Sequence, residues 1–263
     1  MRGGNEIHWA SVMAIAWVTV LEGIRTRMVG LMVVVFLMGM GLAFFAGALA
    51  VMETREVEAA VAGFFLRLGA VVTLALFVLS AQVREFHDKG IDLVLSLPIP
   101  RAGYLLGRLA GFALIALVVA AVFSSGTLLF APVWQSVLWG GSLFVELLLV
   151  IALAVFSLLT FQQVPPAFAL VMAVYFLARS VVVLQWVGQG PIMPQGVWTV
   201  WLMNRFIDVL AFFLPALDRM TQSDWLVHGD GGWDDLVFVL FQGGIYLALL
   251  VTAALIDLYR KNF

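Results

Sequence analysis

The chain has 263 residues, of which 63% are hydrophobic and only 11% are charged, and its formal net charge at pH 7 is −2. About a quarter of the residues of a soluble domain are charged, so this composition excludes an ordinary soluble domain and predicts a polytopic membrane protein. There is no cysteine, which excludes disulfides, thiolate metal sites and a catalytic thiol. The basic residues are scattered over short segments rather than gathered in one patch, so nucleic acid is not an expected partner.

The N-terminal segment, residues 5–27, combines an apolar surface with a narrow polar stripe. At about 100° per residue its polar groups fall within a sector of about 80°. These groups are His8, Ser11, Thr19, Glu22 and Thr26. Such a helix suits the membrane interface, so we expect an interfacial amphipathic helix, with a first spanning helix as the alternative. The segment lacks the residue order of a cleaved signal peptide.

Six apolar stretches are each long enough for the ~20 residues that a spanning helix needs. They predict an all-α polytopic protein in which residues 1–263 form a single transmembrane domain. The expected spans are 28–52, 59–83, 109–130, 137–161, 167–187 and 236–256. Residues 162–166 are expected to form a tight turn, because Pro166 disfavours a helical conformation of the residue before it.

Residues 188–235 do not form a comfortable span. Three prolines interrupt them, and residues 197–213 are rich in Trp, Phe and Leu but carry Asn204, Arg205 and Asp208. We expect one or two re-entrant or interfacial helices in the outer leaflet, followed by a hydrophilic loop.

The distribution of Lys and Arg predicts the orientation, because cytoplasmic loops of membrane proteins are enriched in these residues. With both termini in the cytoplasm, nine of the 14 basic residues face inward: Arg2, Arg25, Arg27, Arg84, Lys89, Arg101, Arg108, Arg260 and Lys261. We therefore expect a multi-pass protein of the bacterial cytoplasmic (inner) membrane. Residues 84–108 are then cytoplasmic, and residues 188–235 are extracytoplasmic.

The densest mixed-charge segment lies between the second and third predicted spans, at residues 84–108. Its charges precede a short apolar patch, and Pro98 and Pro100 prevent a helix from continuing. We expect a short amphipathic helix from about Glu85 to Leu97 whose polar face contacts a partner in water. A solvated connector that only satisfies the charge rule is the alternative.

This layout resembles the type-2 ATP-binding-cassette (ABC) exporter permeases. The shared features are six spans, an amphipathic N-terminal segment that ends in a basic turn, a long outer segment before the last span, and a cytoplasmic Leu-Ser-x-Pro-x-x-Arg stretch at residues 95–101. In that family this stretch belongs to the coupling helix that docks on the nucleotide-binding subunit. The resemblance implies coupling roles for Glu85, Asp88, Lys89, Gly90, Asp92, Leu95, Ser96, Pro98 and Arg101.

The chain contains no Gly-x-x-x-x-Gly-Lys-Ser/Thr loop, so it is not expected to hold nucleotide phosphates itself. The resemblance implies a permease subunit of an exporter, not an enzyme, with ATP and magnesium bound by a cytoplasmic P-loop ABC ATPase. A second permease copy would complete a homodimer or pseudodimer. The alternative is a membrane carrier that does not use ATP, or a membrane assembly factor.

Three charged side chains fall inside predicted spans: Arg67, Glu146 and Arg179. A charge at a span centre costs about 2.5–3.5 kcal/mol on insertion scales and is usually paired or faces a cavity. At ~1.5 Å per residue the three lie at comparable depths, so we predict that Glu146 pairs with Arg179 or Arg67. A structural ion pair and the polar lining of a translocation path are the two interpretations. No metal centre is expected, because His8 and His87 are predicted to be cytoplasmic whereas His228 is predicted to lie outside.

Overall fold

A computed structural model describes residues 9–87, 101–189 and 198–260, and within these ranges the chain is helical and contains no β-strand. In chain order the elements are α1 (Trp9–Arg25), α2 (Met28–Leu49), α3 (Thr54–His87), α5 (Arg101–Thr127), α6 (Val133–Phe161), α7 (Val164–Gln189), α8 (Trp198–Phe213), the short 3-10 helix η1 (Leu217–Arg219), α9 (Asp224–Val227) and α10 (Trp233–Arg260). In the described part of the chain, six helices are long and apolar enough to cross a membrane: α2, α3, α5, α6, α7 and α10. The predicted all-α architecture is thereby confirmed, and the six helices that could cross a membrane indicate a multi-pass membrane protein.

Several helices extend beyond the predicted spans, because a charged residue ends an apolar run without ending a helix. The clearest case is α3, which has 34 residues and includes charged side chains at both ends. The predicted turn at residues 162–166 was too long. Gln162 caps α6 in the left-handed conformation, and α7 already begins at Val164. Pro165 and Pro166 lie in the first turn of α7, where proline removes no intrahelical hydrogen bond.

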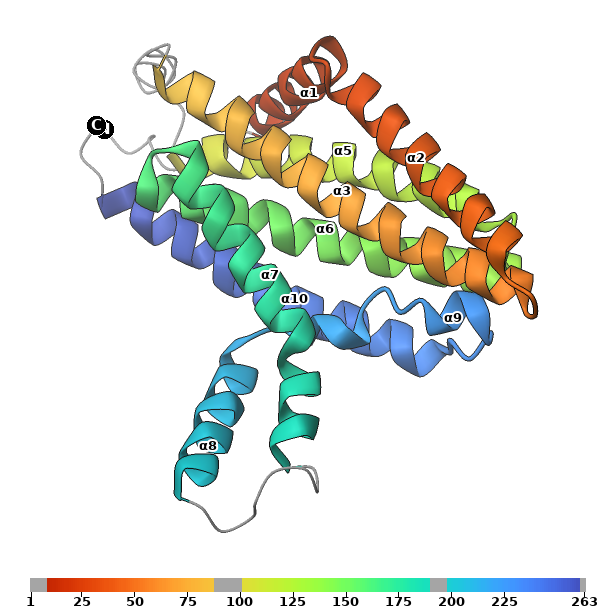
Figure 1. Ribbon diagram of the computed structural model, residues 1–263. Helices are drawn as coiled ribbons and strands as arrows, with labels where there is room; N and C mark the ends of the chain where they lie inside the picture. Colours follow the sequence, from red (N-terminus) through yellow and green to blue (C-terminus); the bar gives the residue numbers. More distant parts are fainter. Residues whose placement is uncertain (1–8, 88–100, 190–197, 261–263) are drawn as a thin grey trace, which may run out of the picture.

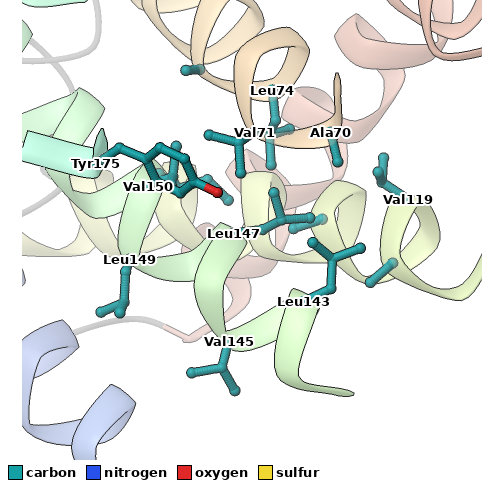
Figure 2. Close-up of a cluster of buried hydrophobic side chains, with 14 of the residues drawn as sticks. Ala70, Val71, Leu74, Val119, Leu143, Val145, Leu147, Leu149, Val150 and Tyr175 are labelled. Carbon is teal, nitrogen blue, oxygen red and sulfur yellow. The ribbon is translucent and has the colours of Figure 1, made fainter. Parts of the chain in front are cut away.

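The core lies where α3, α5 and α6 pack against one another, and α6 is buried along most of its length (Figure 1). Figure 2 shows side chains of α3, α5 and α6 meeting there, among them Val71, Leu74, Val119, Leu143 and Leu147. Leu74, Leu143 and Leu147 are fully buried. Helices packed in this way cannot easily rotate about their axes, so the polar side chains that α3 and α6 carry into the bundle have fixed positions.

Helix α1 packs closely along α5 through small residues. A side chain at Gly107 would meet Ile15, and one at Gly111 would meet Thr19. Gly23 in turn lies against Ile115. The offset between the paired positions is constant, so the two helices run in the same direction side by side. The predicted N-terminal helix is thus present, with one face against α5 and its tryptophans exposed.

The second half of α7 and α8 form a helical hairpin that projects from the bundle (Figure 1). Gln185 Nε2 of α7 donates a hydrogen bond of 3.2 Å to Asp208 Oδ1 of α8. After α8 the chain bends by 62° into residues 217–227, which is the geometry of a broken span or a re-entrant loop. This returning segment, called the outer segment below (residues 214–232), packs on α3, α6 and α7.

One end of the bundle, called the basic end, carries Arg84 near the end of α3, Arg108 near the start of α5 and Arg260 at the end of α10. This end carries the C-terminus of α3, the N-terminus of α5, the turn between α6 and α7 and the C-terminus of α10 (Figure 1). The outer segment and the connections after α2 and α5 lie toward the opposite end.

Candidate functional sites

The three intramembrane charges come together in one buried charge cluster, made by Arg67 of α3, Glu146 of α6, and Tyr175 and Arg179 of α7. Glu146 is fully buried. Its Oε1 accepts a 2.7 Å hydrogen bond from the Tyr175 hydroxyl and lies 3.7 Å from Arg179 Nη1. The prediction of an ion pair is therefore confirmed, and its partner is Arg179 rather than Arg67.

Both guanidinium groups bind backbone carbonyls of the outer segment. Arg179 Nη1 donates to Leu217 O at 2.7 Å and to Met220 O at 3.0 Å, and its Nη2 donates to Thr221 O at 3.2 Å. Arg67 Nη1 donates to the same Thr221 carbonyl at 2.8 Å. The rigid fork of donors on arginine suits this arrangement, because one side chain can satisfy several carbonyls at once.

Thr221 is held from the α6 side as well. It is fully buried and has a φ of 48°, a left-handed conformation that is uncommon for a residue other than glycine. Its N–H donates a 2.7 Å hydrogen bond to Ser142 Oγ. Residues of three helices thus fix a strained backbone position. Ser142, Tyr175 and Thr221 could not be recognised from the sequence, because ordinary polar residues in and near apolar helices carry no distinctive signal.

The contacts of the buried charge cluster attach the outer segment to α3 and α7. Its charged groups are two cations and one carboxylate, and each of the three binds groups of the chain itself. The carbonyl dipoles of the outer segment offset part of the excess positive charge. These contacts fit the interpretation as a structural ion pair, and two buried atoms of the cluster, Glu146 Oε2 and Arg67 Nε, have no hydrogen-bond partner among the described residues.

A second polar group, called the charge clamp, lies at the basic end and consists of Glu22, Arg84, Glu85 and Arg108. Arg108 is buried, and its Nη1 lies 2.9 Å from Glu22 Oε2 while its Nη2 lies 2.7 Å from Glu85 Oε2. Its Nη1 also donates to Thr19 Oγ1 at 3.1 Å. Arg84 Nη2 lies 3.4 Å from Glu22 Oε1. The charge clamp therefore joins α1, α3 and α5.

The charge clamp lies at the base of both helices that lead into residues 88–100. The predicted short helix was expected to begin at about Glu85, but Glu85 belongs to the last turn of α3, which continues to His87. Its carboxylate is directed to Arg108, so it does not belong to an exposed polar face. Arg101 is the first residue of α5. Seven of the predicted coupling residues lie outside the described residues: Asp88, Lys89, Gly90, Asp92, Leu95, Ser96 and Pro98.

Within the described ranges, no group of three or more His, Asp or Glu residues is placed to hold a metal ion. The fold and its two polar groups define a multi-pass helical membrane protein with an internally anchored outer segment. No protein-family model matches the chain. The comparison with curated proteins likewise gives no match.

Proposed function

We propose that this chain is the permease subunit of an ABC exporter of the type-2 class, which moves its substrate across the bacterial cytoplasmic membrane. ATP hydrolysis would take place on a separate cytoplasmic P-loop ATPase, and a second permease copy would complete a homodimer. The observation that carries the proposal is the charge clamp, because it ties together the two helices that flank the segment with the coupling-helix pattern. A docked ATPase can drive spanning helices only if the docking segment is mechanically joined to them.

Helix α3 supports this proposal because it can transmit a displacement through the membrane. It runs without interruption from Thr54 to His87 and carries Glu85 of the charge clamp as well as Arg67 of the buried charge cluster. At ~1.5 Å per residue these two side chains are about 27 Å apart along the helix. A shift of the docking segment would thus reach the Thr221 carbonyl, and with it the outer segment. Packed elements of this kind move as units.

The proposed orientation places the basic end in the cytoplasm and can be tested by labelling single cysteines, since the chain has none of its own. Asp230 is exposed, whereas Ser223 packs against Gly63 and is a poorer labelling site. We expect an impermeant maleimide to label Asp230→Cys in intact cells, and to label Lys89→Cys only after the membrane is opened. The opposite pattern would contradict the orientation and the docking proposal with it.

The experiment that tests the function is co-purification with the P-loop ATPase encoded beside this gene. Reversing two acids of the docking segment, Asp88→Lys with Asp92→Lys, should weaken association because like charges then face each other across the interface. Glu85 is left intact, because its change would also break the charge clamp. We expect a loss of bound ATPase and of the ATP turnover of the complex.

The matched control is Asp230→Lys with Asp234→Lys, which reverses the same number of charges at exposed positions near the start of α10. This control should retain wild-type association and turnover. If the wild-type chain binds no P-loop ATPase, or if the Asp88 and Asp92 reversals have no effect, the carrier or assembly-factor alternative replaces the exporter proposal.

A further inference from the structure

A large open cavity lies at the basic end, between the turn that joins α1 to α2 and the last third of α3. Its volume is about 870 Å³, and the N-terminus of α7 also borders it. The cavity is separate from the buried charge cluster, and it shares one residue, Arg84, with the charge clamp.

The wall of this cavity changes from basic to apolar along its length. Arg25, Arg27 and Arg84 line it together with apolar side chains of α2 and α3 such as Leu31 and Leu76. On α3 the lining runs from Thr73 to Arg84, about 16 Å at ~1.5 Å per residue. The cations lie near its membrane-surface end, since Arg25 and Arg27 directly precede the charge-free span α2, while the apolar wall extends toward the bilayer interior.

The cations of the cavity are available to an external anion. Arg25 and Arg27 are exposed, and neither forms an ion pair with a carboxylate in the described part of the chain. The Arg84 side chain is 55% exposed and shares the Glu22 carboxylate with Arg108, which binds that carboxylate at the shorter distance. Three arginines therefore face the cavity. Of these, Arg84 alone has a carboxylate partner in the described part of the chain, and it shares that partner, Glu22, with Arg108.

From this geometry we infer that the cavity binds an anionic phospholipid. The phosphate lies among Arg25, Arg27 and Arg84, and the first part of an acyl chain lies along Leu31 and Leu76. Arginine binds phosphate oxygens with paired hydrogen bonds, and basic pockets between spanning helices are known to hold anionic headgroups. The cavity is open and borders α2 and α3, two of the helices that are apolar enough to cross a membrane. This inference does not depend on the exporter proposal.

A bound phosphate would have a structural consequence for the charge clamp. It would join the α1–α2 turn to α3 and would compete with Glu22 for Arg84. Arg84 lies three residues before the end of α3. Occupancy by lipid would therefore exchange the Arg84–Glu22 ion pair for a phosphate link between the α1–α2 turn and the end of α3 that leads into residues 88–100.

The inference is tested with the full-length protein in neutral detergent, titrated with dioleoyl phosphatidylglycerol, dioleoyl phosphatidylcholine or inorganic phosphate. Native mass spectrometry counts bound lipids, and thermal unfolding reports stabilisation. We expect phosphatidylglycerol to bind and stabilise, and the other two probes to do so far more weakly. The variant Arg25→Gln with Arg27→Gln and Arg84→Gln should lower the phosphatidylglycerol affinity roughly 100-fold, since each basic residue near a lipid surface contributes about a factor of five.

Two further variants distinguish a built site from general positive charge. Changing Arg55, Arg205 and Arg260 to Gln removes the same charge from exposed positions elsewhere and should leave the affinity for phosphatidylglycerol unchanged. Leu31→Trp fills the apolar part of the cavity while keeping every cation, and it should reduce binding of phosphatidylglycerol as well. Equal losses in the two triple variants would overturn the inference, and so would inorganic phosphate binding as tightly as the lipid. Wild-type affinity in Leu31→Trp would contradict the placement of the acyl chain.

Discussion

Replacing Glu146 by Gln is expected to lower the free energy of unfolding by about 3–5 kcal/mol, the usual cost of removing one partner from a buried ion pair. The carboxylate is fully buried and is the partner of both Tyr175 and Arg179. Without its charge, the buried Arg67 and the partly buried Arg179 keep only carbonyl dipoles to offset their positive charges. Unfolding in mixed micelles of neutral detergent and dodecyl sulfate measures the change.

The matched control is Glu53→Gln, which makes the same chemical change at an exposed position after α2 and should alter stability by less than about 0.5 kcal/mol. A double-mutant cycle identifies the partner of Glu146. Combined with Arg179→Met, the Glu146→Gln change should cost about 1–3 kcal/mol less than it does alone, whereas Arg67→Met should give a smaller recovery. Additive losses with both arginines would contradict the ion pair.

Arg108→Met is expected to produce the second large effect, a loss of about 2–3 kcal/mol, because it leaves the Glu22 and Glu85 carboxylates without their shared cation. This cost is smaller than for Glu146 because both carboxylates are partly exposed and water screens them. If the proposed function is correct, ATP turnover by the complex should become insensitive to the transported substrate. The docking segment would still bind the ATPase, but α3 would no longer be held to α5 and α1 by these ion pairs, so the three helices would not move as one unit.

Adding Glu22→Gln and Glu85→Gln to Arg108→Met should restore part of the lost stability, since the unpaired negative charge is then removed. It should not restore the response of ATP turnover to substrate, because the join between the helices remains absent. Arg260→Met is the control, as Arg260 is an exposed arginine in the last turn of α10. If Arg108→Met kept wild-type stability and a wild-type response of ATP turnover to substrate, the ion pairs of the charge clamp would contribute to neither.

The ends of the helices show how far hydropathy can be relied on. The predicted second span, residues 59–83, contains the apolar middle of α3 but misses a turn or more at each end. A helix continues into water wherever its backbone hydrogen bonds are kept and its side chains are compatible, so an apolar run marks the membrane and not the helix. The end of the apolar run therefore led to the wrong prediction that Glu85 begins a separate helix. The structure places it on α3, paired with Arg108.

The six apolar helices, and the position of Arg67, Glu146 and Arg179 within three of them, were determined by the sequence itself. In lipid each segment must satisfy its own backbone hydrogen bonds, so the existence of a span is a local property that composition reveals. Only the tertiary structure decided that Glu146 pairs with Arg179 while Arg67 binds the Thr221 carbonyl. That choice depends on the rotation of three helices and on the path of the outer segment. Both are decided by long-range packing, which no local pattern of residues encodes.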